Sequence, residues 1–167
     1  MRKVVVVLVL AVFLLSTGSW AKVGRVTLGA IYSSKSASGM TASLSGLQAK
    51  YGVTDNFDLE GRGQLGYVYD TSPLVTLTYI SGLGVYNLNA LSDRFVPYVG
   101  AGFVMWTVSS GTTWTLASGG QSYSSLVALL GFNAYFTDQF AFTADVVRES
   151  ISTASVTGVT LGLNYTF

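Results

Sequence analysis

The 167-residue chain is apolar and poor in charge: 50% of its residues are hydrophobic, 10% are charged, and the formal net charge is +1. An ordinary soluble domain carries about 25% charged residues, and this chain has no apolar run of about 18 residues that could form a membrane helix. Such a composition is typical of a β-barrel embedded in a bilayer. The absence of Cys and His excludes disulfides, Cys-His zinc sites and Ser-His or Cys-His catalytic pairs.

Residues 1–21 have the features of an export signal. The basic start Met1-Arg2-Lys3 is followed by residues 4–15, which include no polar side chain, and then by the small-x-small sequence Ser19-Trp20-Ala21. As a helix, this apolar run rises only about 18 Å, too short for a hydrocarbon core of about 30 Å. We therefore expect a cleaved signal peptide and a mature domain over residues 22–167. Without Arg2 and Lys3 the balance is seven basic against eight acidic residues, a net charge of −1, which does not suit a nucleic-acid-binding protein.

The mature chain alternates between apolar and polar residues with a period of two, which predicts strands. Eight segments of about ten residues show this pattern, at 26–32, 47–53, 57–69, 75–85, 97–105, 126–136, 140–146 and 159–167. We assign the apolar side of each segment to the lipid, and in the fourth segment this rule places Leu77, Tyr79, Leu83 and Val85 on the outside. The sequence thus predicts an all-β fold, an eight-stranded antiparallel up-and-down transmembrane barrel.

Charged residues provide an independent check on the assigned faces. Of the eight charged residues that we assign to a strand face, seven fall on the side opposite the apolar residues, namely Arg25, Lys50, Asp58, Glu60, Arg62, Asp145 and Glu149. A soluble sandwich would show the reverse arrangement, with its charges on the outer face. The exception, Arg148, is expected at the outer rim. There it either extends past the acyl layer or pairs with an anionic lipid head group.

The connections between segments differ in length at the two ends of the expected barrel. Residues 54–56, 88–94 and 137–139 form short turns, whereas residues 33–43, 70–74, 107–122 and 150–155 are expected to form longer loops. Short turns belong to the periplasm and long loops to the exterior. Both termini are then periplasmic, and Lys35 lies in an external loop.

The polar face predicts a network of side chains in the lumen. If Asp55 is the centre of its turn, Lys50 faces Glu60 and Gln48 faces Arg62. The expected network comprises Arg25, Gln48, Lys50, Asp58, Glu60, Arg62, Gln64 and Asp145. It could form a gated pore or ligand site, or a plug of paired charges. We favour the plug because eight strands leave room only for side chains.

Three motifs resemble the small OmpA/OmpX-type outer-membrane barrels of Gram-negative bacteria. They are Tyr51-Gly52-Val53-Thr54-Asp55-Asn56-Phe57-Asp58-Leu59, Pro97-Tyr98-Val99-Gly100-Ala101-Gly102 and Leu161-Gly162-Leu163-Asn164-Tyr165-Thr166-Phe167. The resemblance implies a location in the outer membrane, among lipids that include lipopolysaccharide, whose phosphate is then the anionic group that Arg148 could contact. It also implies that Leu163, Tyr165 and Phe167 form the C-terminal signal read by the barrel-assembly machinery.

Aromatic residues near the strand ends predict two interfacial girdles, in which we include Tyr79. Trp114 lies in the longest expected loop, where it contacts a glycan or another surface, or packs on a strand above the bilayer.

The expected function is structural or one of surface interaction: envelope integrity, adhesion or ligand contact through the outer loops. The chain is expected to be a monomer without cofactor, metal or enzymatic activity, and its external ligand cannot be read from the sequence. The alternatives are a small channel for minor or apolar solutes and, disfavoured by the absence of His, a lipid-modifying barrel enzyme.

Overall fold

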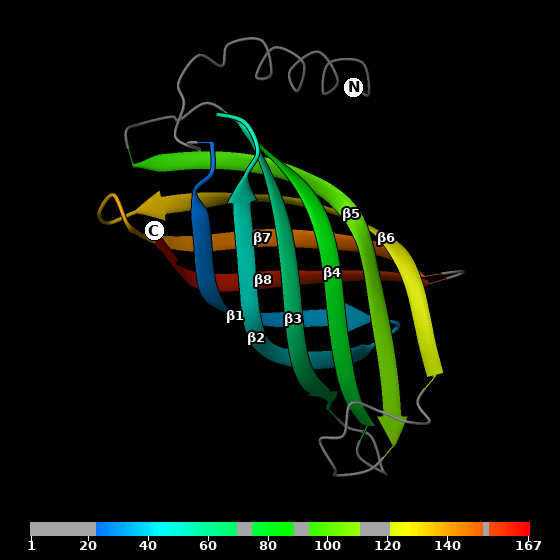
Figure 1. Ribbon diagram of the computed structural model, residues 1–167. Coiled ribbons are helices and arrows are strands. Elements are labelled where there is room, and N and C mark those ends of the chain that lie inside the picture. Colours follow the sequence, from blue (N-terminus) through cyan, green and yellow to red (C-terminus); the bar gives the residue numbers. More distant parts are fainter. Residues whose placement is uncertain (1–22, 70–74, 89–93, 111–120, 152–153) are drawn as a thin grey trace, which may run out of the picture.

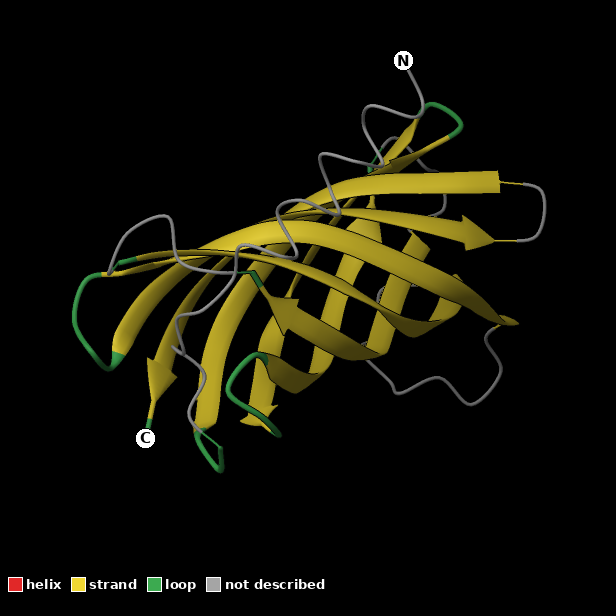
Figure 2. Cartoon of the chain, turned by 90° about the horizontal axis from the view of Figure 1, so that it is seen from above, coloured by secondary structure: helices red, strands yellow, loops and turns green. Residues whose placement is uncertain are grey.

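The computed structural model describes residues 23–69, 75–88, 94–110, 121–151 and 154–167; the expected signal peptide and Trp114 lie outside them. Among the described residues, no helix is long and apolar enough to cross a membrane. The chain forms a closed antiparallel barrel in which each strand pairs with its neighbours in sequence and β1 pairs with β8 (Figures 1 and 2). The strands are β1 (Val26–Ala37), β2 (Met40–Gly52), β3 (Phe57–Val68), β4 (Val75–Asn87), β5 (Phe95–Ser110), β6 (Gln121–Tyr135), β7 (Phe140–Ile151) and β8 (Ala154–Thr166). The predicted fold class is confirmed.

The strands are longer than expected, with 12 residues in β1 and 16 in β5. In place of the expected loop at 33–43, β1 and β2 continue to a two-residue turn at Ser38 and Gly39, whose φ angles are 49° and 84°. Positive φ at both central residues is the requirement of a type I′ hairpin turn. These Ser- and Thr-rich segments have the composition of loops, because strand ends that rise above the acyl layer need not be apolar. The prediction that Lys35 lies in an external loop is wrong, since Lys35 belongs to β1.

The turns at the opposite end are short, as the sequence predicts. Residues 53–56 join β2 to β3, and residues 136–139 join β6 to β7. In both turns a Thr hydroxyl accepts a backbone N–H: Thr54 Oγ1 from Asn56 at 3.3 Å and Thr137 Oγ1 from Phe140 at 3.0 Å. The hydroxyl thus satisfies a donor that the strand ladder cannot reach. This end also bears the start of β1 and the end of β8 (Figure 1).

The predicted faces are correct for seven of the eight strands. On the outside, Leu47 and Phe103 are each 70% exposed, whereas the inward-facing Gln48 is 2% exposed. In a barrel that spans a membrane, this exposed apolar exterior contacts lipid rather than water.

The prediction for β4 is wrong, because its apolar residues face the lumen. Leu77, Tyr79, Leu83 and Val85 are at most 7% exposed, and Ile80 on the opposite face is 47% exposed. Tyr79 therefore belongs to the interior and not to an interfacial girdle. The four residues belong to an apolar cluster with members mainly on β4, β5 and β6. Apolar alternation cannot distinguish lipid from lumen where the lumen itself is apolar.

Candidate functional site

The centre of the lumen holds a network of buried ion pairs built on adjacent strands. Lys50 on β2 lies opposite Glu60 on β3, which is the register expected from a turn centred on Asp55. The Lys50 Nζ atom is 3.1 Å from Glu60 Oε2. Arg62, two residues along β3 on the same face, donates from Nε to Glu60 Oε1. One carboxylate is therefore shared by two cations that lie on different strands.

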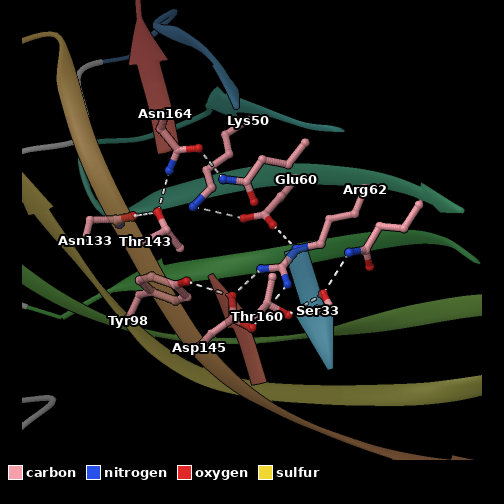
Figure 3. A network of polar contacts seen from close by, with 12 residues as sticks. Ser33, Lys50, Glu60, Arg62, Tyr98, Asn133, Thr143, Asp145, Thr160 and Asn164 are labelled. Atoms are coloured by element: carbon pink, nitrogen blue, oxygen red, sulfur yellow. Dashed lines mark hydrogen bonds and ion pairs between the residues drawn. The ribbon is translucent and has the colours of Figure 1, made fainter. Parts of the chain in front are cut away.

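Arg62 carries this network across the barrel to β7 (Figure 3). Its two terminal nitrogens donate to the two oxygens of Asp145, at 3.2 and 2.7 Å, in a bidentate arrangement. The Tyr98 hydroxyl of β5 donates to Asp145 Oδ2 at 3.0 Å. Arg62 and Asp145 are 3% and 2% exposed. The guanidinium thus links opposite walls of the barrel, and we call this Arg62–Asp145 pair the Arg62 brace. Lys cannot reproduce its bidentate geometry.

Amides and hydroxyls extend the network toward β6 and β8. Gln48 donates to Asn164, which donates to Thr143, and the Thr143 hydroxyl donates to Asn133 Oδ1 at 2.7 Å. On the outer side, Gln64 donates to Ser33 Oγ at 2.7 Å, and Ser33 is hydrogen-bonded to Thr160 at 2.9 Å (Figure 3). These bonds satisfy polar groups that burial would otherwise leave unpaired.

A second charged cluster lies nearer the outer end and was missed by the sequence analysis as a site. Lys35 Nζ is 2.5 Å from Glu149 Oε1 and 3.4 Å from the centre of the Tyr79 ring. Glu149 also accepts the Tyr79 hydroxyl at 3.1 Å and Trp106 Nε1 at 2.7 Å. Parity predicts Glu149 on the inner face, but the sequence pattern predicts its partner Lys35 in a loop and Tyr79 on the lipid face. Continuing the β1 alternation beyond residue 32 would have placed Lys35 inside.

Two predicted members of the lumenal network, Asp58 and Arg25, line the same small hollow as Lys50 but belong to none of the ion pairs described above. Asp58 accepts a hydrogen bond from Asn87 Nδ2 at 2.8 Å. Arg25 lines a small polar hollow at the end that bears the termini and forms none of the ion pairs described above. The structure thus brings together Lys50, Glu60, Arg62 and Asp145.

Both clusters close the lumen with paired charges. Their six charged residues are at most 8% exposed: Lys35, Lys50, Glu60, Arg62, Asp145 and Glu149. In the described part of the chain, no group of three or more acidic side chains is placed to hold a metal ion. The arrangement is suited to cross-linking the barrel walls and to obstructing the passage of ions.

The outer surface carries the remaining predicted residues. Leu163 and Phe167 are 63% and 68% exposed, and Tyr165 lies between them on the same lipid-facing row. Arg148 is exposed on β7 opposite Ala128 of β6. It borders a surface hollow of about 580 Å³ whose other walls include Phe103 and Leu126.

A closed antiparallel barrel with an apolar exterior and a charged interior defines a transmembrane β-barrel of the outer-membrane class. The family model of the outer membrane protein beta-barrel domain matches residues 5–167. The chain belongs to this family and is an outer-membrane protein. A search of curated proteins found no sequence match.

Three solved structures illustrate the similarity. Neisserial surface protein A has 18% identity and a TM-score of 0.67, over 86% of this chain and 96% of that chain. The N-terminal barrel domain of Pseudomonas aeruginosa OprF has 21% identity and a TM-score of 0.61, over 84% and 97%. The attachment invasion locus protein Ail of Yersinia pestis has 16% identity and a TM-score of 0.60, over 87% and 100%. At these identities the similarity concerns the fold alone.

Proposed function

We propose that the chain is a non-conducting outer-membrane barrel with a structural role, which contacts the exterior through its outer connections. The observation that carries this proposal is the obstructed lumen, where the Arg62 brace joins β3 to β7 and the Lys35–Glu149 pair joins β1 to β7. A small-solute channel would need room beside these side chains. The absence of Cys and His from the sequence supports a function other than catalysis.

Planar-bilayer recording tests the obstructed lumen directly. The purified protein should give no discrete openings. Replacing both members of the brace, Arg62→Ser with Asp145→Ser, should produce openings, because it removes two large side chains and their ion pair from the middle of the lumen. Arg25→Ser, on the same inner face but outside the ion pairs, is the matched control and should remain closed. Discrete openings of the unaltered protein would support the channel alternative and refute the proposal.

The charge of the outer connections limits the kind of external ligand. Residues 70–74, 111–120 and 152–153 contain a single charged residue, Asp70. The similar protein Ail is known in complex with the heparin analogue sucrose octasulfate. A polyanion of that kind needs cations, which these segments of the present chain lack. We therefore propose neutral partners, such as uncharged glycans, recognised by hydroxyl and aromatic groups. Glycan-array binding that is insensitive to salt would support this, and a preference for sulfated glycans would contradict it.

A second proposal concerns lipid binding by Arg148. Its side chain is exposed beside an apolar hollow, so that an acyl chain and an anionic head group could be held together. Bidentate pairing with a lipopolysaccharide phosphate would distinguish Arg from Lys. Lipopolysaccharide should then raise the melting temperature of the unaltered protein most, of Arg148→Lys less, and of Arg148→Gln least, relative to phospholipid bilayers. Equal gains for all three would refute the contact.

A further inference from the structure

The outer end of the lumen contains a hollow of about 270 Å³ that neither charged cluster occupies. Its lining is almost entirely carbon and comes from the strand ends opposite the termini. The principal contributors are Met40, Ala42, Leu77, Trp106, Val108 and Val156. We call this hollow the outer vestibule. Apolar side chains are unexpected at a barrel mouth that faces water, because their exposure to water is unfavourable and brings no hydrogen bonds in return.

The floor of the outer vestibule offers no free polar partner. Lys35 contributes to the lining, but its ammonium group is directed to Glu149 and to the Tyr79 ring. The indole N–H of Trp106 is donated to Glu149, so that Trp106 presents ring carbon to the hollow. Below this level Leu44 is fully buried. The vestibule therefore has a floor of buried side chains, which include the Lys35–Glu149 pair and Leu44, and is not the entrance to a passage.

The walls of the outer vestibule separate it from the membrane on most sides. The strands that carry the lining residues remain paired to this level, with Ala42 opposite Val68 and Leu77 opposite Val108. The rim is uneven, because β6 begins at Gln121 whereas its pairing with β7 begins only at Leu126. Among the described residues the hollow is open toward the outer end, where a molecule could enter without the barrel wall opening.

We propose that the outer vestibule binds a small, uncharged, apolar molecule that arrives from the exterior. An apolar cavity of about 150 Å³ stays dry and binds benzene, and the larger volume here suits a fused bicyclic ring or a short hydrocarbon chain. A charged ligand would lose its hydration without gaining a partner. Mouths of β-barrels are recurrent sites for such ligands. This site is distinct from the surface contacts proposed above, and it requires no conduction.

The test is a titration with naphthalene of methyl-labelled protein in phospholipid nanodiscs, followed by NMR. The Ala42 and Val156 methyl signals should shift by ring current and should saturate. The lipid-facing methyl groups of Ala49 and Leu163 should shift in proportion to added naphthalene, because they report only its partition into the bilayer. Parallel, non-saturating shifts on both faces would overturn the proposal. Contacts of lipid acyl chains with the Ala42 methyl before naphthalene is added would also overturn it, because they would assign the site to membrane lipid.

Two variants on one strand separate occupation of the site from effects on folding. Ala42→Phe fills the outer vestibule and should abolish the saturating shift at Val156. Ala49→Phe adds the same ring on the lipid face and should leave it unchanged. Folding of each variant is checked by heat-modifiable migration in gels, and Ala42→Leu replaces Ala42→Phe if the larger side chain prevents assembly. An unchanged affinity in the filled variant would overturn the proposal.

Discussion

The second charged cluster, which contains Lys35 and Glu149, allows a quantitative test of how much buried ion pairs contribute to the stability of the barrel. Glu149→Gln removes the counter-charge of Lys35, whose side chain is 2% exposed and whose Nζ atom is 2.5 Å from Glu149 Oε1. Breaking a buried ion pair by changing one partner costs about 3–5 kcal/mol. Lys35→Met should cost a similar amount, because it leaves the Glu149 carboxylate buried with only the neutral donors of Tyr79 and Trp106.

The double variant distinguishes the pair from its two members. With Lys35→Met and Glu149→Gln together, no charge remains, and the amide oxygen still accepts one of the two neutral donors. The other donor is left unsatisfied, at a cost of about 1–3 kcal/mol. The two single costs sum to at least about 6 kcal/mol, so the coupling free energy should be at least about 3 kcal/mol.

The measurement is urea-induced unfolding from phospholipid vesicles, followed by tryptophan fluorescence, for the four members of the cycle. Arg148→Gln, on the same strand but exposed, is the control and should change the free energy of unfolding by less than about 0.5 kcal/mol. A coupling free energy below about 1 kcal/mol would mean that Lys35 and Glu149 do not form a buried pair. The second charged cluster would then not exist as described.

Three further predictions address the register, the faces and assembly. Lys50→Ala and Glu60→Ala should show a coupling free energy of about 0.5–3 kcal/mol in the same unfolding assay, because the two side chains form an ion pair at 3.1 Å although Arg62 still pairs with Glu60 when Lys50 is removed, and additive effects would contradict the register of β2 and β3. Spin labels on single cysteines introduced at Ile80 and Ser81 into this Cys-free chain should differ, with lipid-soluble oxygen broadening only the label at 80; the reverse would restore the original assignment of β4. Deletion of Phe167, the exposed end of the C-terminal lipid-facing row, should reduce the heat-modifiable barrel in outer-membrane fractions, and normal levels would argue against an assembly signal at this residue.

The sequence alone determined the barrel, the number of its strands and the faces of seven of them. This was possible because period-two alternation and the positions of charges are local properties of each strand. The turn at Asp55 likewise fixed a local register, and with it the opposition of Lys50 and Glu60. By contrast, the outer parts of β1 and β2 have the composition of loops, so that the sequence did not predict them as strands. The reason is that a strand above the acyl layer has no need of an apolar face.

Only the tertiary structure decided which face of β4 lines the lumen and which charged residues pair across it. Apolar residues on β4 satisfy the alternation rule equally well inside or outside, and packing against Val104 and Trp106 of β5 places them inside. The Arg62–Asp145 and Lys35–Glu149 pairs join residues 83 and 114 positions apart. Such contacts depend on closure of the barrel, which brings distant strands to opposite walls of one narrow lumen. No local pattern of residues carries that information.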